Sequence, residues 1–358
     1  MDLKFDISKP YAIALEGGGA RGAYQVGAWR ALYENGVKFS AVAGSSVGAL
    51  NGAMMVMDDL ESAEALWHNM KFSTVMDVDD DTAKKLLKGK IFQLDLKQVG
   101  EKASKIIKDG GFDVTPLKNL IKTTVDPKKI RNSDKKFYIC THSVTDKKSL
   151  ELDAAALEDE ELFDMLLASA YFPAFKHELL GGKMYTDGGV SNVLPLSPLI
   201  NNGYKDIIAI RLYGFGVEKR VKIPKNTSVL EIAPNKDLGN MLNFDAEHAK
   251  KNYTLGYFDA LRLLYGLYGK TYYIDRTLSE EDAYNVLTKE VTSKKKTKDI
   301  SLRTLHEELI KFSKKSGSKG DYFDVLIAYA EELAKRKKIN EFEILTDRQI
   351  LKKIGLKI

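Results

Sequence analysis

Apolar residues near the start of the chain form short continuous runs that end in glycine-rich turns. Tyr11–Leu15 is such a run, which is typical of a strand buried on both faces. Gly17–Gly22 follows it, and the next residues have the apolar spacing of a helix of about 12 to 15 residues. Asn35-Gly36 is a common helix ending. The pattern predicts a unit of strand, turn and helix.

The same order repeats at once. Phe39–Ala43 is a second apolar run, Gly44-Ser45-Ser46-Val47-Gly48 is a second glycine-containing turn, and a helix is expected from Leu50 to Met57. Two such units in succession indicate a parallel sheet with helical crossovers, because each helix returns the chain to the same edge of the sheet.

Later segments extend this architecture. Helices are expected at Asp59–Met70 and Leu86–Asp109, and Thr115-Pro116 opens another, because proline is favoured just inside a helix start and threonine caps it. Strands are expected at five further places: Phe137–Val144, Ser149–Leu152, Lys183–Thr186, Ile207–Leu212 and Thr271–Ile274. The predicted fold is therefore α/β, a three-layer α/β/α sandwich with a mostly parallel sheet.

The C-terminal quarter has a different pattern. From Arg276 onward the chain is rich in lysine, with helical segments at Leu302–Lys311 and Tyr322–Arg336 and a flexible stretch at Ser313–Gly320 between them. We expect two domains: an α/β domain over residues 1–275 and a small helical C-terminal extension over residues 276–358.

Charge divides the chain at the same place. The 358 residues have a formal net charge of +5. Residues 276–358 contain 19 Lys and Arg against 14 Asp and Glu, whereas the first 275 residues contain 36 of each. The cationic excess fits either an anionic partner surface or an ordinary solvated helical face. No nucleic-acid partner is expected.

The number of cysteines and the length of the apolar runs indicate the cellular compartment of the protein. Cys140 is the only cysteine, so no disulfide forms within the chain, which agrees with a reducing compartment. Met1–Pro10 lacks the apolar core of a signal peptide. Val47–Met57, the longest nonpolar stretch, is broken by Asn51 and is far shorter than the roughly 20 residues that span a bilayer. We expect a cytoplasmic protein whose membrane contact, if any, is peripheral.

The turn between the second strand and the second helix fits G-x-S-x-G, the pattern of a nucleophile elbow. Gly44 and Gly48 permit the sharp turn that presents the Ser46 hydroxyl outside the sheet. At the start of a helix, the dipole and the free N–H of Val47 favour a developing oxyanion. The five-residue pattern alone is common, and plain turn chemistry explains it as well.

The run Gly17–Gly22 fits several kinds of site. It matches the dinucleotide fingerprint G-x-G-x-x-G, but that site needs an acidic residue where this chain has Gly44-Ser45-Ser46. A P-loop needs Gly-Lys-Ser/Thr, which does not follow. Besides a structural turn, an oxyanion hole remains, in which Gly18 and Gly19 bring backbone N–H groups close to an oxyanion. Arg21 then fixes the loop or meets an anionic head group.

A nucleophilic serine needs a base. The histidines lie in no glycine-flanked turn and beside no other recognisable catalytic element: His68, His142, His177, His248 and His306. Asp187 is better placed, because Gly188 and Gly189 let its turn present the carboxylate. A carboxylate with an ordinary pKa of about 3.9 is a weak base in water, so we predict that partial desolvation raises the pKa of Asp187.

In combination these segments resemble the patatin-like phospholipase family. The similar blocks, over roughly residues 8 to 215, are Gly17–Gly22, Gly44–Gly48, Ala168-Ser169 to Pro173, and Asp187-Gly188-Gly189. The resemblance implies a patatin-type fold, a Ser46–Asp187 pair without histidine, and an oxyanion site in the first glycine loop. It also implies ester hydrolysis without a metal or other cofactor.

The expected function is that of a lipid acyl hydrolase of the phospholipase A type, which forms an acyl-enzyme on Ser46 with Asp187 as general base. Two alternatives stay open: a small-molecule carboxylesterase or thioesterase with the same residue pair, and a membrane-binding scaffold with an idle hydrolase fold. Several apolar residues fit either an acyl channel or the core: Met54, Met55, Met57, Tyr171, Phe172 and Phe175.

Overall fold

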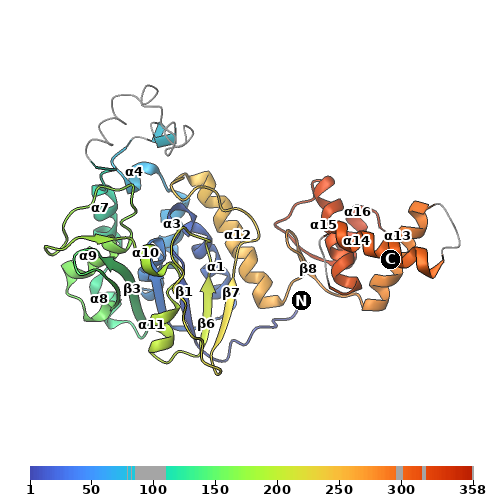
Figure 1. The fold of residues 1–358 in the computed structure, drawn as a ribbon, viewed down its shortest axis with the longest axis horizontal. Helices are drawn as coiled ribbons and strands as arrows, with labels where there is room; N and C mark the ends of the chain where they lie inside the picture. The colour runs from blue at the N-terminus through green and yellow to red at the C-terminus, as the bar shows by residue number, and fades with distance from the viewer. Residues whose placement is uncertain (79, 82, 85–109, 296–300, 317–319, 357–358) are drawn as a thin grey trace. The chain divides into compact units, whose positions relative to one another are not determined.

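The computed structural model describes residues 1–78, 80–81, 83–84, 110–295, 301–316 and 320–356 (Figure 1). The helix predicted at Leu86–Asp109 lies outside these residues. The chain forms two compact units, one of Asp6–Ala260 and one of Met1–Phe5 with Leu261–Ile358. Among the described residues, no helix combines the length and the apolar character that crossing a membrane requires.

A seven-stranded sheet is the centre of the larger unit. Its order is β4-β3-β2-β1-β6-β7, and β5 pairs with β3. The strands are β1 (Tyr11–Leu15), β2 (Phe39–Ser45), β3 (Lys136–Ser143), β4 (Lys148–Asp153), β5 (Tyr185–Thr186), β6 (Asp206–Ile210) and β7 (Ser228–Ile232). The neighbouring pairs β3·β2, β2·β1, β1·β6 and β6·β7 are parallel, whereas β4 and β5 run antiparallel to β3. The predicted mostly parallel sheet is confirmed.

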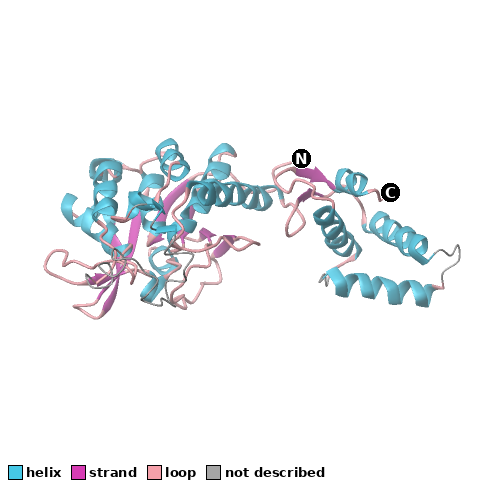
Figure 2. Cartoon of the chain, turned by 90° about the horizontal axis from the view of Figure 1, so that it is seen from above, coloured by secondary structure: helices cyan, strands magenta, loops and turns pink. Residues whose placement is uncertain are grey.

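Helices cover both faces of this sheet, as Figure 2 shows from above. The helices described between residues 23 and 265 are α1 (Ala23–Glu34), α2 (Val47–Val56), α3 (Leu60–His68), α4 (Phe72–Val75), α7 (Thr115–Thr124), α8 (Pro127–Asn132), α9 (Asp159–Ser169), α10 (Gly189–Asn192), α11 (Leu196–Asn201) and α12 (Ala246–Tyr265). On one face Leu199 of α11 packs with the alanines of β1 and β2. On the other, Gly52 of α2 lies against Val42 and Phe137. The predicted three-layer sandwich is confirmed.

Register brings two predicted turns to one edge of the sheet. Leu15 at the end of β1 pairs with Gly44 near the end of β2. Both strands are parallel, so the chain leaves them in the same direction. The glycine run after β1 and the Ser46 turn after β2 therefore lie side by side.

Several local predictions differ from the structure. The strand expected at Lys183–Thr186 is limited to Tyr185–Thr186, because Leu180 and Lys183 pair across a turn. The helix expected to be capped by Thr115 includes Thr115, whose N–H donates to the Asp113 carboxylate at 2.8 Å. Strand β7 was not predicted, because it is only partly buried and lacks a continuous apolar run.

The smaller unit is mainly helical. It contains α13 (Glu280–Lys295), α14 (Leu302–Ser316), α15 (Tyr322–Arg336) and α16 (Asp347–Ile354), with β8 (Tyr273–Asp275) parallel to β9 (Ile344–Thr346). Its own core includes Leu287, Phe323, Leu326 and Ile350, all fully buried. The C-terminal helices are confirmed, but α14 continues to Ser316, so the predicted flexible stretch is wrong for residues 313–316.

The compact units divide earlier than the domains expected from sequence. The charge pattern places a boundary after residue 275, whereas the smaller unit begins at Leu261. The strand expected at Thr271–Ile274 is β8, and it pairs with β9 rather than with the main sheet. Strand pairing thus groups these residues with the C-terminal helices.

Candidate active site

Ser46 occupies a sharp turn between β2 and α2. Its backbone has φ 55° and ψ −128°, a conformation that side-chain-bearing residues adopt at a cost of about 1–3 kcal/mol. The flanking glycines leave no room for a side chain: a Cβ on Gly44 would lie 2.3 Å from the Gly48 carbonyl oxygen, and one on Gly48 would lie 2.3 Å from that of Leu15. The structure thus contains the tight strand-to-helix turn expected from G-x-S-x-G.

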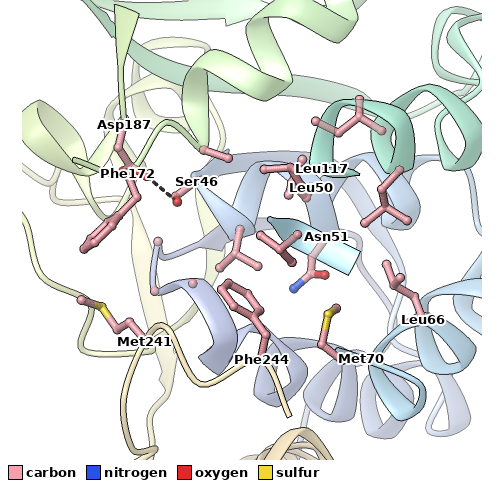
Figure 3. A pocket seen from close by; sticks show the side chains of 18 of the residues that line it. Ser46, Leu50, Asn51, Leu66, Met70, Leu117, Phe172, Asp187, Met241 and Phe244 are labelled. Carbon is pink, nitrogen blue, oxygen red and sulfur yellow. Dashed lines mark hydrogen bonds between the residues drawn. The ribbon is translucent and has the colours of Figure 1, made fainter. Parts of the chain in front are cut away.

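The Ser46 hydroxyl donates a hydrogen bond to Asp187. The distance from Ser46 Oγ to Asp187 Oδ2 is 2.6 Å, across 141 positions of sequence (Figure 3). Ser46 is 8% exposed and Asp187 is 7% exposed. A short bond between nearly buried groups is the geometry in which a carboxylate can take a hydroxyl proton.

The turn after β5 sets the basicity of Asp187. Burial raises the pKa of its carboxyl group to about 6, against the opposing effects of the Ser46 hydroxyl and the Gly189 N–H, which stabilise the carboxylate. The Gly189 N–H lies 2.7 Å from Asp187 Oδ1. A Cβ on Gly188 would lie 2.2 Å from the Cys140 carbonyl oxygen, so this position has no space for a side chain. This direction agrees with the raised pKa expected from sequence.

Ser169 connects the two turns and was assigned no role from sequence. Its Oγ accepts the backbone N–H of Ser46 at 2.9 Å and donates to the Cys140 carbonyl at 2.6 Å. Its own carbonyl accepts the Gly188 N–H at 3.2 Å. Ser169 is fully buried at the end of α9. Its place in the Ala168-Ser169 to Pro173 block was the available signal.

The first glycine loop faces Ser46. A Cβ on Gly17 would lie 3.2 Å from the Cβ of Ser46, and the Gly17 N–H is bonded to the Val193 carbonyl. Within the described residues, the N–H groups of Gly18 and Gly19 have no hydrogen-bond acceptor. Gly19 has φ 56° and lies against the Met241 carbonyl, which only glycine tolerates there.

The helix start beside this loop offers a further donor. In the part of the chain that the structure describes, the N–H of Val47 has no acceptor either. Gly22 at the far end of the loop packs on Val47, since a Cβ there would lie 2.4 Å from Val47 Cγ2. Two loops from separate parts of the sequence therefore contain N–H groups without an acceptor in the described chain, and both loops line the pocket together with Ser46.

Arg21 fixes the loop by binding backbone carbonyls. Its guanidinium donates to the carbonyls of Gly239 (2.8 Å), Leu212 (3.1 Å) and Tyr213 (2.6 Å). Of the two roles considered from sequence, these contacts correspond to holding the loop.

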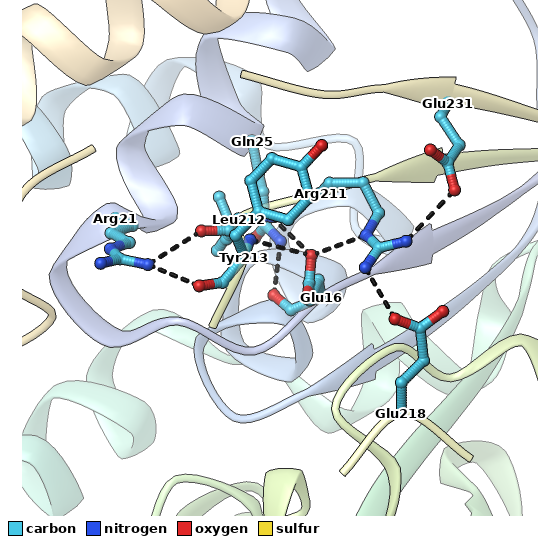
Figure 4. A network of polar contacts seen from close by, with 8 residues as sticks. All are labelled: Glu16, Arg21, Gln25, Arg211, Leu212, Tyr213, Glu218 and Glu231. Atoms are coloured by element: carbon cyan, nitrogen blue, oxygen red, sulfur yellow. Dashed lines mark hydrogen bonds and ion pairs between the residues drawn. The ribbon is translucent and has the colours of Figure 1, made fainter. Parts of the chain in front are cut away.

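Glu16 holds the same region from the other side, as Figure 4 shows. Its fully buried carboxylate accepts the N–H groups of Leu212 at 2.7 Å and Tyr213 at 3.1 Å, and it pairs with Arg211 at 3.0 Å. The glycine loop and the segment after β6 are therefore bonded into one structure.

An apolar pocket opens beside Ser46. It encloses about 1020 Å³ of space, its open mouth included. Its walls come mainly from α2, α3, α7 and the segment around residue 242; examples are Leu50, Met54, Leu66, Trp67, Met70, Leu117, Ile121, Phe172, Phe175, Met241 and Phe244. The polar side chain of Asn51 donates to the Gly22 carbonyl and to Gln25, and it accepts the indole N–H of Trp67. Figure 3 shows Leu66 across the pocket from Ser46.

The residues proposed for an acyl channel divide into two groups. Met54, Phe172 and Phe175 line the pocket. Met55 and Tyr171 belong instead to the core, and Met57 accepts the Asp126 N–H through its sulfur. The sequence did not single out the pocket residues of α3 and α7, because their spacing is equally that of core-facing helices.

The histidines lie in other surroundings. Among the described contacts, none of the five bonds to Ser46 or Asp187: His177 stacks on Tyr171, His248 bonds to backbone carbonyls, and His68 packs on Tyr253. The described residues also include no group of three or more His, Cys, Asp and Glu side chains arranged to hold a metal ion.

Comparisons with known proteins bear on the family of this chain. The patatin-like phospholipase model matches residues 13–200. Similar solved structures include VipD from Legionella pneumophila, at 12% identity and TM-score 0.43, with 92% of this chain and 85% of that chain covered. Another is ExoU in complex with SpcU from Pseudomonas aeruginosa, at 13% identity and TM-score 0.29, with coverage of 98% and 74%. No curated protein matches the chain.

Both TM-scores are below 0.5, so the family assignment depends on the sequence model. That model covers more than half of the 358 residues, including the first glycine loop, the Ser46 turn and Asp187. The chain therefore belongs to the patatin-like phospholipase family, whose members are lipid-hydrolysing esterases.

Proposed function

We propose that this chain cleaves carboxylic ester bonds of lipids, in the manner of a phospholipase A, with Ser46 as nucleophile and Asp187 as its only side-chain base. The observation that carries this proposal is the 2.6 Å hydrogen bond from Ser46 Oγ to Asp187 beside an apolar pocket. No other ionisable side chain in the described structure bonds to the Ser46 hydroxyl.

Asp187 takes the serine proton as Ser46 Oγ attacks the acyl carbonyl. The pKa of about 6 supports this step, since the carboxyl group is mostly ionised at neutral pH and still more basic than a surface aspartate. The proton then passes to the oxygen of the leaving alcohol, and the acyl group stays on Ser46. A water molecule, deprotonated by Asp187, cleaves this ester and restores the free hydroxyl.

Backbone N–H groups stabilise the oxyanion in both halves of this reaction. Gly18, Gly19 and Val47 are the donors that we propose, because their N–H groups lack acceptors within the described chain and line the pocket beside Ser46. Fixed donors of this kind each contribute about 2.7–4 kcal/mol to the transition state in other serine hydrolases. Arg211, Arg21 and Glu16 hold the segments that carry them.

The pocket favours a lipid acyl chain over a small polar acyl group. Its walls are mainly aliphatic and aromatic, and the polar side chain of Asn51 among them already bonds to Gly22, Gln25 and Trp67. Burial of each methylene of an acyl chain contributes about 0.8 kcal/mol. A long chain therefore gains more from this pocket than an acetyl or butyryl group does.

Labelling with a fluorophosphonate tests the nucleophile. We expect the wild type to be labelled, Ser46→Ala to be unlabelled, and Asp187→Asn to be labelled at least a hundredfold more slowly. Ser45→Ala is the matched control, because Ser45 is the neighbouring buried serine and should not alter labelling by more than a few-fold. Labelling that persists in Ser46→Ala would exclude the proposed nucleophile.

Substrate comparison separates a phospholipase from a small-molecule esterase. We expect dispersed diacyl phospholipid to be cleaved with a higher kcat/KM than a water-soluble butyryl ester. The opposite preference, with no release of fatty acid from phospholipid, would favour the carboxylesterase alternative. Binding to liposomes without turnover of any ester would favour the scaffold.

A further inference from the structure

The segment that follows β6 exposes apolar side chains beside the active site. Phe215 is 83% exposed, Tyr213 is 56% and Val217 is 55% exposed, and Val190 of α10 is 44% exposed. Single exposed apolar residues are ordinary on protein surfaces. Here Tyr213, Phe215 and Val217 occupy every second position of one short segment. Val190 lies three residues after Asp187.

Backbone contacts hold this segment against both catalytic turns. The Val217 N–H donates to the Gly189 carbonyl at 2.8 Å, and the Val193 N–H donates to the Val217 carbonyl at 2.9 Å. Gly214 lies so close to the glycine loop that a Cβ there would be 1.9 Å from the Gly17 carbonyl oxygen. The exposed side chains therefore have a fixed position at the site.

Phe215 marks the mouth of the pocket. It is among the residues that line the cavity, although most of its surface faces solvent. A residue can satisfy both conditions only at the opening. Its ring therefore lies where the pocket meets solvent.

The same segment continues into exposed cations. Arg220, Lys222 and Lys225 are exposed, and within the described structure none of them forms an ion pair. Its other charges are already paired: Glu218 with Arg211, and Lys219 with Glu151. The unpaired charge of this segment is therefore entirely positive.

We propose that residues 213–225, together with Val190, form a docking surface for a lipid layer with anionic head groups. Phe215, Tyr213 and Val217 enter the apolar layer, while the three unpaired cations contact phosphate or carboxylate groups. Docking here places the mouth of the pocket at the lipid surface, so an acyl chain moves from lipid to pocket without crossing water. This inference rests on the proposed function and adds the physical state of the substrate.

Vesicle binding tests this surface without turnover. All variants are made in Ser46→Ala. Binding is measured by co-sedimentation with vesicles of phosphatidylcholine alone and with vesicles of phosphatidylcholine that contain the anionic lipid phosphatidylserine, whose surface attracts basic segments. The cation variant is Arg220→Gln, Lys222→Gln and Lys225→Gln together. The apolar variant is Phe215→Ser.

Matched controls come from elsewhere in the same unit. Lys128→Gln, Lys129→Gln and Lys136→Gln together remove three other exposed cations, and Tyr33→Ser removes an aromatic residue that is 65% exposed. Circular dichroism and thermal unfolding confirm that each variant is folded.

We expect the cation variant to lose about a hundredfold in affinity for the phosphatidylserine vesicles, at about fivefold for each of its three cations. Phe215→Ser should lose affinity for both kinds of vesicle. The controls should change affinity less than twofold. If the loop variants bind vesicles as well as the control variants do, the proposed docking surface is wrong. That result is also the one expected if the lysine-rich C-terminal unit supplies the binding.

A second arm keeps this result separate from the proposed function. With Ser46 present, the cation variant should lose more activity on phosphatidylserine-containing vesicles than on a soluble butyryl ester. An equal loss on both substrates overturns the docking surface while leaving the esterase function intact. Loop-dependent vesicle binding without any ester hydrolysis supports the surface and contradicts the proposed function.

Discussion

At the scale of single residues, the ionisation of Asp187 should govern the rate. Its carboxyl group must be ionised to accept the Ser46 proton, and burial holds its pKa at about 6. We expect kcat/KM for an uncharged ester to be level above pH 7 and to fall about tenfold per pH unit well below pH 6. Initial rates from pH 4.5 to 8 measure this limb. A flat profile between pH 5 and 7 would contradict the role of Asp187.

The same carboxyl group should destabilise the fold at neutral pH. Its folded pKa of about 6 lies above the ordinary value of 3.8, so the folded protein keeps the proton more tightly than the unfolded chain. The contribution of this group to the free energy of unfolding is fully present below pH 3.8. It is lost as the pH rises through 6, and the total loss is about 3 kcal/mol.

Asp187→Asn cannot ionise, so we expect it to be more stable than the wild type at pH 7 and to lose much of that advantage at pH 5. Urea unfolding at the two pH values measures the difference. If Asp187→Asn changes the free energy of unfolding equally at pH 7 and pH 5, the Asp187 carboxyl group titrates with an ordinary pKa.

Ser169 should act as a positioning residue. Ser169→Ala leaves the Ser46 N–H and the Cys140 carbonyl without their partner, at about 1–3 kcal/mol for each unpaired buried group. We expect kcat to fall 10- to 100-fold with KM nearly unchanged, because the strained Ser46 turn loses its anchor.

The control is Ser197→Ala, which removes another buried serine hydroxyl, one bonded to Glu151 and Asn192. It should lower stability but leave kcat per folded molecule within a few-fold. Equal losses of kcat in the two variants would reduce Ser169 to a structural role.

At the scale of elements, α1 and α12 cross at two glycines. A Cβ on Gly27 would lie 1.9 Å from the Tyr253 carbonyl oxygen, and one on Gly256 would lie 1.9 Å from that of Tyr24. Alanine is favoured over glycine in a helix by about 1 kcal/mol, but here backbone would have to move. We expect Gly256→Ala to destabilise the protein by more than about 2 kcal/mol, as overpacking does.

Thermal unfolding checks this expectation. Gly36→Ala is its control, because a Cβ at Gly36 meets nothing within 4 Å and only the positive φ of 71° opposes it, at about 1–2 kcal/mol. If Gly256→Ala proves stabilising, intrinsic helix propensity outweighs the close crossing.

The local sequence indicated the elements that carry the site, because turn residues act over a few positions. Gly44, Gly48, Gly188 and Gly189 mark their turns in the local sequence, although contacts with distant residues such as Leu15 and Cys140 complete them. By contrast, the edge strand β7 has no continuous apolar run, and only its pairing with β6 identifies it. The role of Ser169 also depends on contacts across the sheet, which sequence spacing does not reveal.

At the scale of the whole molecule, the two compact units should respond to damage separately. Asp347 is fully buried in the smaller unit and accepts the N–H groups of Thr277 (2.6 Å) and Leu278 (2.8 Å). Asp347→Ala leaves these donors unpaired, which costs several kcal/mol in a unit with its own core. We expect this unit to unfold in an earlier transition, while ester hydrolysis by the larger unit persists at temperatures above that transition.

Differential scanning calorimetry with a parallel activity assay measures this. The control is Asp321→Ala, which removes only the exposed N-cap of α15 and should cost about 1 kcal/mol. Loss of hydrolysis together with the first transition would show that the larger unit does not keep its structure alone.

The contact of the glycine loop with Met241 has a consequence for how the protein is made. The Ala20 N–H donates to the Met241 carbonyl at 2.7 Å, and Gly19 packs on the same group. A ribosome releases the nucleophile turn long before it adds residue 241. Until then the first loop lacks this support, so an unfinished chain emerging near cellular lipids would carry Ser46 without a complete site to use it.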